Sequence, residues 1–379
     1  MPVQRKLKMG IIGGGPGSFI GPVHYKAAIL DNKVELVAGA FSRDEVKSKK
    51  TGRQLFLNPR RVYHNFADML ENEKILPKGE RIDFVTIATP NDSHFAISIE
   101  ALKAGFHVMC EKPMTVTVEE ARELQEVVRS TGKIFALMHN YTGYPMVKLA
   151  RDLVRKGKLG EVRKVVVQYP QGRHKKPLEH LKSRKSGGIE DIGTHAENLA
   201  EYVSGLRISE VCADLQILEE EPKLDYDGNC LLRFTNGAHG IIHFSKIAMG
   251  EENNLAIWVY GSNKSIEWRQ ERPNILKIYE PDSPVQIWRR GNDYISKIST
   301  AAARASRLPG GHPEAFLEAF ANIYHNFCDT IIQLSAGREA NAVTNDFPKV
   351  SDGLRGMLFV ETVIKSAGSS EKWTKMPEK

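Results

Sequence analysis

The sequence predicts an α/β protein of two domains, and three observations support this. Strand-like and helical segments alternate regularly up to about residue 138. Beyond that point, strand-like segments follow one another with turn residues between them. The length of 379 residues exceeds what one hydrophobic core usually serves. We therefore expect a doubly wound parallel (Rossmann) sheet over residues 1–138 and a second α/β domain over residues 139–379.

Short apolar runs define the strands of the first domain. They are expected at Leu7–Ile12, Val34–Phe41, Ile82–Ala88, Phe106–Cys110 and Ile134–Met138. Helical patterns lie between them. One helix begins at Thr117, with Glu120 completing a capping box, and Gly105 follows another helix as a left-handed cap. This order is typical of a parallel sheet with helices on both faces.

The second domain begins with a helical segment, and most of its strands come later in the chain. Helices are expected at 145–156, 191–204, 314–332 and 350–366, and strands at 162–169, 210–218, 228–234, 239–245, 254–261, 264–269 and 276–280. Asn236-Gly237 is a strong hairpin signal between two of these strands. The pattern predicts a mainly antiparallel sheet with helices on one side.

Composition narrows the class of protein. The chain is 41% hydrophobic and 26% charged, with no apolar run long enough to span a membrane and no signal-peptide pattern, so we expect a cytoplasmic protein. The net charge is +7, and one dense basic stretch lies at Arg173–Lys185. This stretch is either a solvated loop or a loop that favours anionic or polyhydroxyl ligands. Nucleic-acid binding is not expected, because no nucleic-acid-binding module is present.

The four cysteines lie far apart, and none are in C-x-x-C spacing. Reduced, structural thiols are therefore expected. Cys110 could act as a catalytic thiol because it precedes Glu111, but a buried cysteine at a strand end is far more common.

A glycine-rich turn follows the first predicted strand and precedes a helix. Its residues are Gly13, Gly14, Gly15, Pro16, Gly17 and Ser18. In such a turn a pyrophosphate can bind backbone N–H groups at the helix start, and a side chain would block its approach. Ser18 takes the place of the third glycine of the usual spacing. The turn predicts a dinucleotide site.

The end of the second strand selects between NAD and NADP. An acidic residue there would bind the ribose 2′-hydroxyl of NAD. The sequence reads Ser42-Arg43-Asp44. If Ser42 occupies the acidic position, Arg43 can meet a 2′-phosphate, which slightly favours NADP. If Asp44 turns toward the ribose, NAD is the cofactor.

Three residues suggest hydride transfer. Lys112 follows a predicted buried strand, and Asp191 and His195 lie four residues apart at the start of a helix. Oxidation of a secondary alcohol needs a base for the hydroxyl proton, and the imidazole of His195 suits this role. It also needs a donor that holds the oxygen, for which a rigidly placed Lys112 is suited. Asp191 would orient the imidazole or bind a neighbouring hydroxyl.

The sequence resembles the glucose–fructose oxidoreductase/inositol dehydrogenase (Gfo/Idh/MocA) family over essentially the whole chain. The resemblance is carried by the glycine turn, Thr89-Pro90-Asn91-Asp-Ser-His94, Glu111-Lys112-Pro113 and Asp191-Ile-Gly-Thr-His195. It implies a Rossmann domain, a C-terminal domain with an open-faced sheet, and NAD(P)-dependent oxidation or reduction of sugars, cyclitols or related polyols. It also implies a homodimer or homotetramer formed through that sheet, and no metal.

The resemblance assigns roles by position. Lys112 is the active-site lysine, Asp191 the orienting acid and His195 the general acid/base. The implied cofactor-binding residues are Gly13, Gly15, Pro16, Gly17, Ser18, Ser42, Arg43, Thr89, Pro90, Asn91, His94, Glu111 and Lys112. Asn140, Tyr141 and Tyr144 follow the first domain, and they and His312 are expected to bind substrate or, equally, to pack.

Two other functions are compatible with the same scaffold. One is a glycosidase that uses tightly held NAD to oxidise the sugar transiently, which acidifies a neighbouring C–H and permits elimination. The other is a non-catalytic dinucleotide sensor. Relatives of the sensor type lack the lysine and the histidine, and both are present here.

Overall fold

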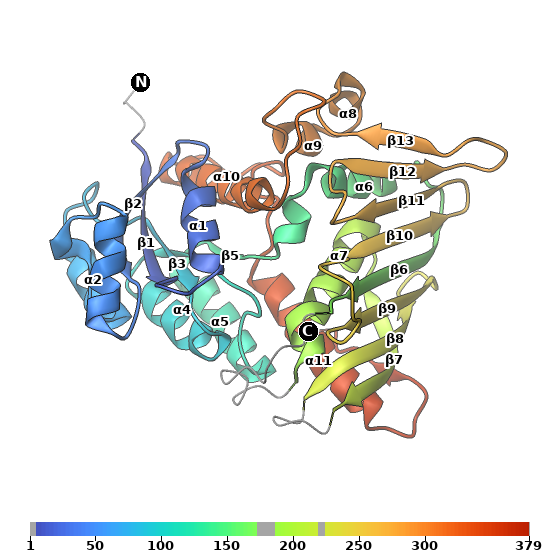
Figure 1. The fold of residues 1–379 in the computed structure, drawn as a ribbon, viewed down its shortest axis with the longest axis horizontal. Helices are drawn as coiled ribbons and strands as arrows, with labels where there is room; N and C mark the ends of the chain where they lie inside the picture. The colour runs from blue at the N-terminus through green and yellow to red at the C-terminus, as the bar shows by residue number, and fades with distance from the viewer. Residues whose placement is uncertain (1–4, 173–185, 219–223, 379) are drawn as a thin grey trace. The chain divides into compact units, whose positions relative to one another are not determined.

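A computed structural model of the chain describes residues 5–172, 186–218 and 224–378. The chain divides into two compact units, drawn with all their elements in Figure 1. The first contains Met1–Met138 and Phe320–Leu354, and the second contains His139–Ala319 and Arg355–Lys379. The assignment of dinucleotide and substrate binding to separate domains stays a prediction.

The first unit is built on a five-stranded parallel sheet in the order β2-β1-β3-β4-β5. Its strands are β1 (Leu7–Gly13), β2 (Val34–Ala40), β3 (Phe84–Ala88), β4 (His107–Cys110) and β5 (Phe135–Leu137). All five residues of β3 are buried, as expected for a central strand covered on both faces. The predicted doubly wound parallel sheet is confirmed.

Helices connect these strands. They are α1 (Ile20–Ile29), α2 (Glu45–Gln54), α3 (Phe66–Lys74), α4 (His94–Lys103) and α5 (Val118–Thr131). The capping box at Thr117 is confirmed, since its hydroxyl accepts the N–H of Glu120 at 3.2 Å and Glu120 caps in return. Gly105 has a φ of +92°, in agreement with the predicted left-handed cap. From far along the chain, α10 (Phe316–Ser335) contributes buried aromatic residues to this unit.

The second unit contains a nine-stranded sheet in the order β13-β12-β11-β10-β6-β9-β8-β7-β14. Its strands are β6 (Val162–Pro170), β7 (Ile208–Ile217), β8 (Asp225–Phe234), β9 (His239–Ser245), β10 (Ala256–Gly261), β11 (Ser265–Arg269), β12 (Ile275–Tyr279), β13 (Gln286–Arg289) and β14 (Thr374–Lys375). Only β6 and β9 pair in parallel. The mainly antiparallel sheet is confirmed, and Gly237 in the β8–β9 hairpin has a φ of +86°.

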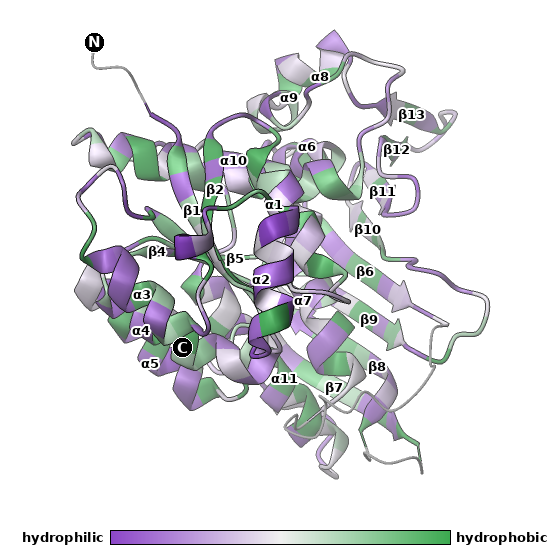
Figure 2. Cartoon of the chain, turned by 60° about the vertical axis from the view of Figure 1, so that its left-hand side comes forward, coloured by the Kyte–Doolittle hydropathy of each residue, from purple (hydrophilic) through white to green (hydrophobic). Residues whose placement is uncertain are grey.

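The helices of this unit are α6 (Pro145–Arg155), α7 (Thr194–Ser204), α8 (Asp293–Ile298), α9 (Thr300–Arg304) and most of α11 (Val350–Ala367). Of these, α6 and α7 pack against the sheet, α8 and α9 pack against α6, and Ser366 of α11 hydrogen-bonds β7. In β6, Val165 and Val167 are buried, whereas Lys164 and Val166 on the other face are at least partly exposed. Figure 2 shows hydrophobic and hydrophilic residues mixed along the strands. One face of the sheet therefore forms the core of the unit.

Candidate active site

The glycine-rich turn joins β1 to α1. The N–H of Ser18 donates to the carbonyl oxygen of Gly15 at 3.0 Å, which closes a four-residue turn. Pro16 occupies its second position and Gly17, with a φ of +86°, its third. A left-handed residue after proline is the pattern of a type II turn, which explains why this short sequence bends so tightly.

Side chains are excluded from the start of this turn. A Cβ on Gly13 would lie 2.4 Å from the carbonyl oxygen of Ala88, and one on Gly15 would lie 2.5 Å from that of Phe41. The residues from Gly13 to Ser18 are nevertheless partly or fully exposed. The turn thus presents backbone N–H groups at the start of a helix without covering side chains, which fits the pyrophosphate of a dinucleotide.

Ser18 at the third glycine position is accommodated by a displaced glycine. Its hydroxyl accepts the N–H of Gly21 at 3.1 Å, in the first turn of α1. A Cβ on Gly21 would lie 2.3 Å from Cα of Gly14, so Gly21 provides the close helix–strand approach that the third glycine of the motif usually provides. The departure from the usual spacing is a longer turn with the same packing.

The residues after β2 hold the predicted cofactor-selecting positions. Asp44 is the N-cap of α2, and its carboxylate accepts the N–H of Lys47 at 3.1 Å. The hydroxyl of Ser42 accepts the N–H of Asp44, also at 3.1 Å. Arg43 is exposed. Asp44 is therefore engaged in capping a helix, while Arg43 projects a guanidinium into solvent.

Lys112 follows β4 directly, as predicted. The carboxylate of Glu111 accepts the backbone N–H of Lys112 at 3.0 Å, and the Lys112–Pro113 peptide bond is cis. Glu111 is only 8% exposed and is also hydrogen-bonded to Nε2 of His24 at 2.9 Å. Cys110 is fully buried, and burial raises the pKa of its thiol far above the usual value, so the thiol is a packing group.

The segment after β3 forms a short polar loop. Ser93 donates its hydroxyl to Oγ1 of Thr89 at 2.8 Å, and Asn91 is buried. His94 is 1% exposed, with Nδ1 2.7 Å from the carbonyl oxygen of Pro113 and Nε2 2.9 Å from that of Thr89. Both ring nitrogens of His94 therefore face backbone carbonyl oxygens. His94 thereby ties the end of β3 to the segment that carries Lys112.

In the second unit, Asp191 lies in a π-helical turn, Ile189–Gly193, that precedes α7. The helix expected over residues 191–204 is confirmed, and its first turn is π-helical rather than α-helical. Such wide turns occur frequently at functional positions. Nζ of Lys246, just after β9, donates to the carboxylate of Asp191. This lysine was missed from the sequence, because nothing local to it marks a partner 55 residues away.

His195 lies among aromatic rings. It is 6% exposed, and its ring packs edge-on against Tyr141 at 4.7 Å between centroids and against His139 at 5.3 Å. Nδ1 of His195 lies 3.4 Å from Nδ1 of His139. Of the residues predicted to bind substrate, the structure thus brings Tyr141 to the predicted base.

A carboxamide organises the hydroxyl groups of this cluster. The hydroxyl of Tyr169 donates to Oδ1 of Asn253 at 2.8 Å, and Nδ2 of Asn253 donates to the hydroxyl of Tyr141 at 3.2 Å. The two tyrosine hydroxyls also hydrogen-bond each other. Burial, and next the neighbouring Tyr141, raise the pKa of Tyr169 well above its usual value, so its hydroxyl stays protonated. Asn253 was missed from the sequence because it lies in a loop.

The other residues predicted to bind substrate have different surroundings. Asn140 is 3% exposed, and its Nδ2 has no hydrogen-bond acceptor among the described residues. Tyr144 is 1% exposed and packs against Trp268. His312 is exposed and, within the described part of the chain, makes none of the contacts of the His195 cluster. The basic stretch Arg173–Lys185 lies outside the described residues.

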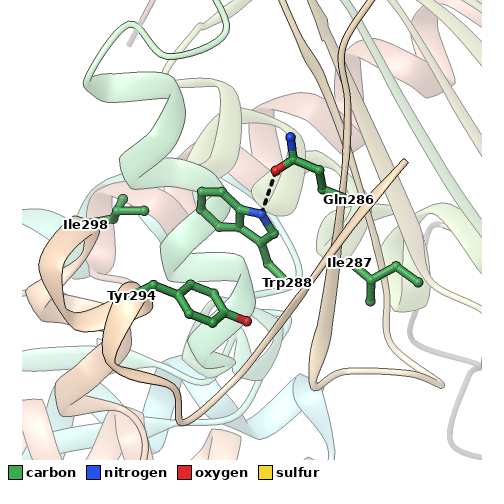
Figure 3. Close-up of a pocket in the computed structure, with 5 residues that line it drawn as sticks. All are labelled: Gln286, Ile287, Trp288, Tyr294 and Ile298. Atoms are coloured by element: carbon green, nitrogen blue, oxygen red, sulfur yellow. Dashed lines mark hydrogen bonds between the residues drawn. The ribbon is translucent and has the colours of Figure 1, made fainter. Parts of the chain in front are cut away.

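Figure 3 shows an open pocket beside β13. Its lining residues are Gln286, Ile287, Trp288, Tyr294 and Ile298. The indole N–H of Trp288 donates to Gln286 at 2.9 Å, and the hydroxyl of Tyr294 accepts the N–H of Arg289 at 2.9 Å. The pocket contains none of the predicted site residues, and these polar groups already have partners within the protein, so it does not suggest a ligand.

The described residues contain neither a candidate metal site nor a candidate membrane-spanning helix. No group of three or more His, Cys, Asp or Glu side chains there could hold a metal ion. None of the described helices combines the length and apolar character that a membrane crossing requires.

Comparison with known proteins agrees with this geometry. Residues 7–139 match the model of an oxidoreductase family with an NAD-binding Rossmann fold, and residues 147–267 match the GFO/IDH/MocA C-terminal domain. An uncharacterized oxidoreductase, YfiI, of Bacillus subtilis (strain 168) is 30% identical, with 98% of this chain and 97% of that protein covered.

Two further relatives have described activities or ligands. Levoglucosan dehydrogenase of Pseudarthrobacter phenanthrenivorans is 26% identical over 99% of both chains. A crystal structure of an inositol dehydrogenase homolog from Azotobacter vinelandii, complexed with NADH and myo-inositol, is 33% identical, covers 98% of both chains and has a TM-score of 0.91. The resemblance inferred from the sequence is confirmed, and the chain belongs to the GFO/IDH/MocA family of NAD-binding oxidoreductases.

Proposed function

We propose that the protein is an NAD(P)-dependent dehydrogenase that transfers a hydride between the nicotinamide and a secondary hydroxyl or ketone of a sugar, cyclitol or related polyol. The observation that carries the proposal is the likeness, over nearly the whole chain, to a structure holding NADH and myo-inositol. The glycine turn supports it, because its backbone fits a pyrophosphate.

The proposed chemistry divides between two side chains. When bound, the nicotinamide supplies the hydride acceptor or donor. In oxidation, His195 takes the proton of the substrate hydroxyl, and the ammonium of Lys112 holds the oxygen while it becomes a carbonyl. The backbone of Lys112 is anchored by Glu111, which supports a fixed position for this cation.

Asp191 and Asn140 have supporting roles in the proposal. Because Asp191 accepts a hydrogen bond from Lys246, we expect it to act with that lysine in binding substrate hydroxyls rather than on His195 alone. Asn140 presents a buried amide nitrogen without a described acceptor, and a buried donor is costly unless a ligand or water completes it. A substrate hydroxyl would satisfy it.

For the cofactor, the Ser42-Arg43 sequence slightly favours NADP, whereas the matching family model is NAD-binding and the related structure holds NADH. Asp44 caps α2, which leaves Arg43 as the charged group after β2 that could meet a 2′-phosphate. Fluorescence titration of the purified protein with NADH and NADPH tests this preference. Tighter binding of NADH would show that Asp44 leaves its cap to bind the ribose.

The experiment that tests the function is a substrate panel. Sugars and inositols are incubated with the preferred oxidised cofactor, and absorbance at the reduced-nicotinamide band is followed. Accumulation of reduced cofactor with a polyol supports a dehydrogenase. Cleavage of a glycoside with no net change in cofactor would indicate the glycosidase instead. Dinucleotide binding without any turnover would indicate a sensor, and absence of binding would overturn the proposal.

We expect a homodimer or homotetramer formed through the open face of the second sheet. Strand register aligns one row of residues across that face: Cys212, Leu231, Ile241, Val166, Trp258, Glu267, Lys277 and Ile287. Leu231 is 46% exposed and Ile287 is 52% exposed. Apart from Glu267 and Lys277, which pair with each other, the row is apolar, and such a surface is typical of a subunit interface.

Light scattering coupled to size-exclusion chromatography tests this association. Leu231→Arg should lower the measured mass to that of a smaller assembly or a monomer. Leu334→Arg is the matched control, because Leu334 is equally exposed, at 46%, on α10 of the other unit. A wild-type monomer at micromolar concentration would contradict the expected oligomer. We also propose a cytoplasmic location, which the four free cysteines support.

A further inference from the structure

A buried chain of hydrogen bonds runs through the first unit and ends beside Lys112. Oγ1 of Thr86 on β3 lies 3.0 Å from the hydroxyl of Tyr324 on α10. That hydroxyl lies 2.7 Å from Nδ1 of His24 on α1, and Nε2 of His24 lies 2.9 Å from Oε1 of Glu111. Four segments that are distant in sequence thus meet through side chains alone.

The members of this chain are shielded from solvent. Thr86 and His24 are 0% exposed, Tyr324 is 1% exposed and Glu111 is 8% exposed. The ring of His24 packs edge-on against Phe320 and Tyr324, at 5.4 and 5.9 Å between centroids. Two aromatic walls therefore hold the imidazole in one orientation, and the hydrogen bonds are made in a low-dielectric environment.

The donors of this chain can be assigned from chemistry. An ionised Glu111 only accepts hydrogen bonds, so Nε2 of His24 must carry a hydrogen. Nδ1 of a neutral imidazole then accepts, which makes the hydroxyl of Tyr324 its donor. Burial raises the pKa of Tyr324 well above its usual value and keeps that hydroxyl protonated. The hydroxyl of Tyr324 and Nε2–H of His24 then both donate in the direction of Glu111.

Glu111 connects this chain of hydrogen bonds to the backbone of Lys112. While one carboxylate oxygen faces His24, the other accepts the backbone N–H of Lys112 at 3.0 Å. A buried carboxylate needs such donors, because it is costly to bury without them. Without His24, Glu111 would be drawn toward water or another donor, and the peptide of Lys112 would lose its fixed acceptor.

We infer that His24 is a positioning residue, which acts through Glu111 to fix the peptide that carries Lys112, with Tyr324 setting the tautomer of His24. The inference rests on the proposed function for the catalytic role of Lys112. Because α1 begins directly after the glycine turn, His24 also links the helix at the dinucleotide turn to the catalytic lysine. In this inference His24 acts only through Glu111 and does not itself contact the substrate or the nicotinamide.

Three substitutions at position 24 separate positioning from simple packing. A glutamine amide reaches about as far as Nε2 of histidine, so His24→Gln keeps the donor to Glu111. An asparagine amide reaches only as far as Nδ1, so His24→Asn faces Tyr324 and leaves Glu111 without its donor. His24→Leu fills the space with no donor. Chain reach alone thus predicts that glutamine rescues and asparagine does not.

Steady-state kinetics with the polyol found by the substrate panel measures the effect. We expect His24→Leu and His24→Asn to lower kcat by 10- to 100-fold, with the dinucleotide dissociation constant changed less than threefold. His24→Gln should lie within fivefold of wild type. The control is His325→Gln, which removes a histidine of α10 that pairs with Asp31 and should leave kcat unchanged.

Equal kcat values for the glutamine and asparagine variants would overturn the inference, as would a fully active His24→Leu. Urea unfolding of each variant shows whether it is folded. Hydrogen exchange at the Lys112 amide provides a readout without turnover: it should quicken in His24→Leu and His24→Asn, but not in His24→Gln. If wild type turns over no polyol, the proposed function fails, and exchange alone then decides the positioning role; unchanged exchange refutes it.

Discussion

The two units hold their predicted catalytic residues by different means. In the first unit, Lys112 is held through its backbone, whose N–H donates to the carboxylate of Glu111, and the glycine turn excludes a Cβ at Gly13 and Gly15. In the second unit, His195 is surrounded by side chains, including Tyr141 and His139. If the proposed division of labour holds, the dinucleotide site depends mainly on backbone shape, while the substrate site could change its specificity by exchanging side chains.

Removing either of the two proposed catalytic side chains should give the largest effect. We expect Lys112→Ala and His195→Ala each to lower kcat by roughly a hundredfold or more, which is the usual scale of general acid/base catalysis. Dinucleotide affinity should be largely retained. Steady-state kinetics with parallel fluorescence titration measures both quantities. Unchanged turnover in His195→Ala would show that another group is the base.

If the dinucleotide site depends on backbone shape, substitutions at Gly15 and Gly17 of the same turn should affect dinucleotide affinity differently. A Cβ on Gly15 meets a carbonyl oxygen at 2.5 Å, so Gly15→Val should weaken dinucleotide binding by about a hundredfold, near 2.7 kcal/mol. No atom lies within 4 Å of a Cβ on Gly17, and asparagine tolerates its φ of +86°. Gly17→Asn should therefore bind the dinucleotide almost as tightly as wild type in the same titration. An equal loss of affinity in both variants would show that steric exclusion at Gly15 is not the cause.

His107, at the start of β4, should make the stability of the protein depend on pH. Burial, and next the charge of Lys133, lower its pKa to about 4. As pH falls below about 6.5, the unfolded chain takes up a proton that the folded chain refuses, so stability falls with pH. Between pH 7.5 and 5 the loss should be about 2 kcal/mol. Urea unfolding at both pH values should show it in wild type.

The matched variant is His107→Asn, whose amide oxygen can accept the Ile134 N–H that Nδ1 of His107 accepts at 2.9 Å. The variant has no proton to gain, so its stability should change less over the same interval. Identical pH profiles for the two proteins would show that His107 titrates normally in the folded state.

The side-chain network of the second unit should respond to loss of a single hydroxyl. Tyr169→Phe removes a hydrogen bond to Asn253 and one to Tyr141, and loss of about 1.4 kcal/mol corresponds to a tenfold rise in KM for the polyol. Tyr25→Phe is the control, because no hydrogen bond of its hydroxyl to another described residue is observed. A normal KM in Tyr169→Phe would show that the cluster does not depend on this hydroxyl.

Local signals made most of the fold predictable. The Thr117 capping box and Gly105 depend on residues within a few positions of each other, and both were predicted. Helix α3 was missed although Asn65 caps it at the N–H of Asp68, so its signal was present in the sequence. The edge strand β13 was missed because four residues with mixed polarity give too short a period to detect.

The candidate site was predictable only where a motif carries it. The motifs singled out Lys112 and His195 as candidates, whose roles stay predictions. His24 and Tyr324 were not singled out, because 300 residues separate these two partners. Lys246 and Asn253 were missed for the same reason: Lys246 lies 55 residues from its partner Asp191, and Asn253 lies 84 and 112 residues from Tyr169 and Tyr141. The roles of such residues follow from tertiary contacts, which hydrophobic periodicity does not reveal.

The cap on α2 has a consequence for anyone wishing to re-engineer this protein for a different coenzyme. Asp44 accepts the N–H of Lys47, so substituting it would damage a helix start, at a cost of about 1 kcal/mol, while doing little for selectivity. Position 42 is the better position at which to change coenzyme preference. Ser42→Asp would bring a carboxylate within the loop yet leave the cap intact, so a single codon offers a route to redesigning which coenzyme pool the enzyme draws upon.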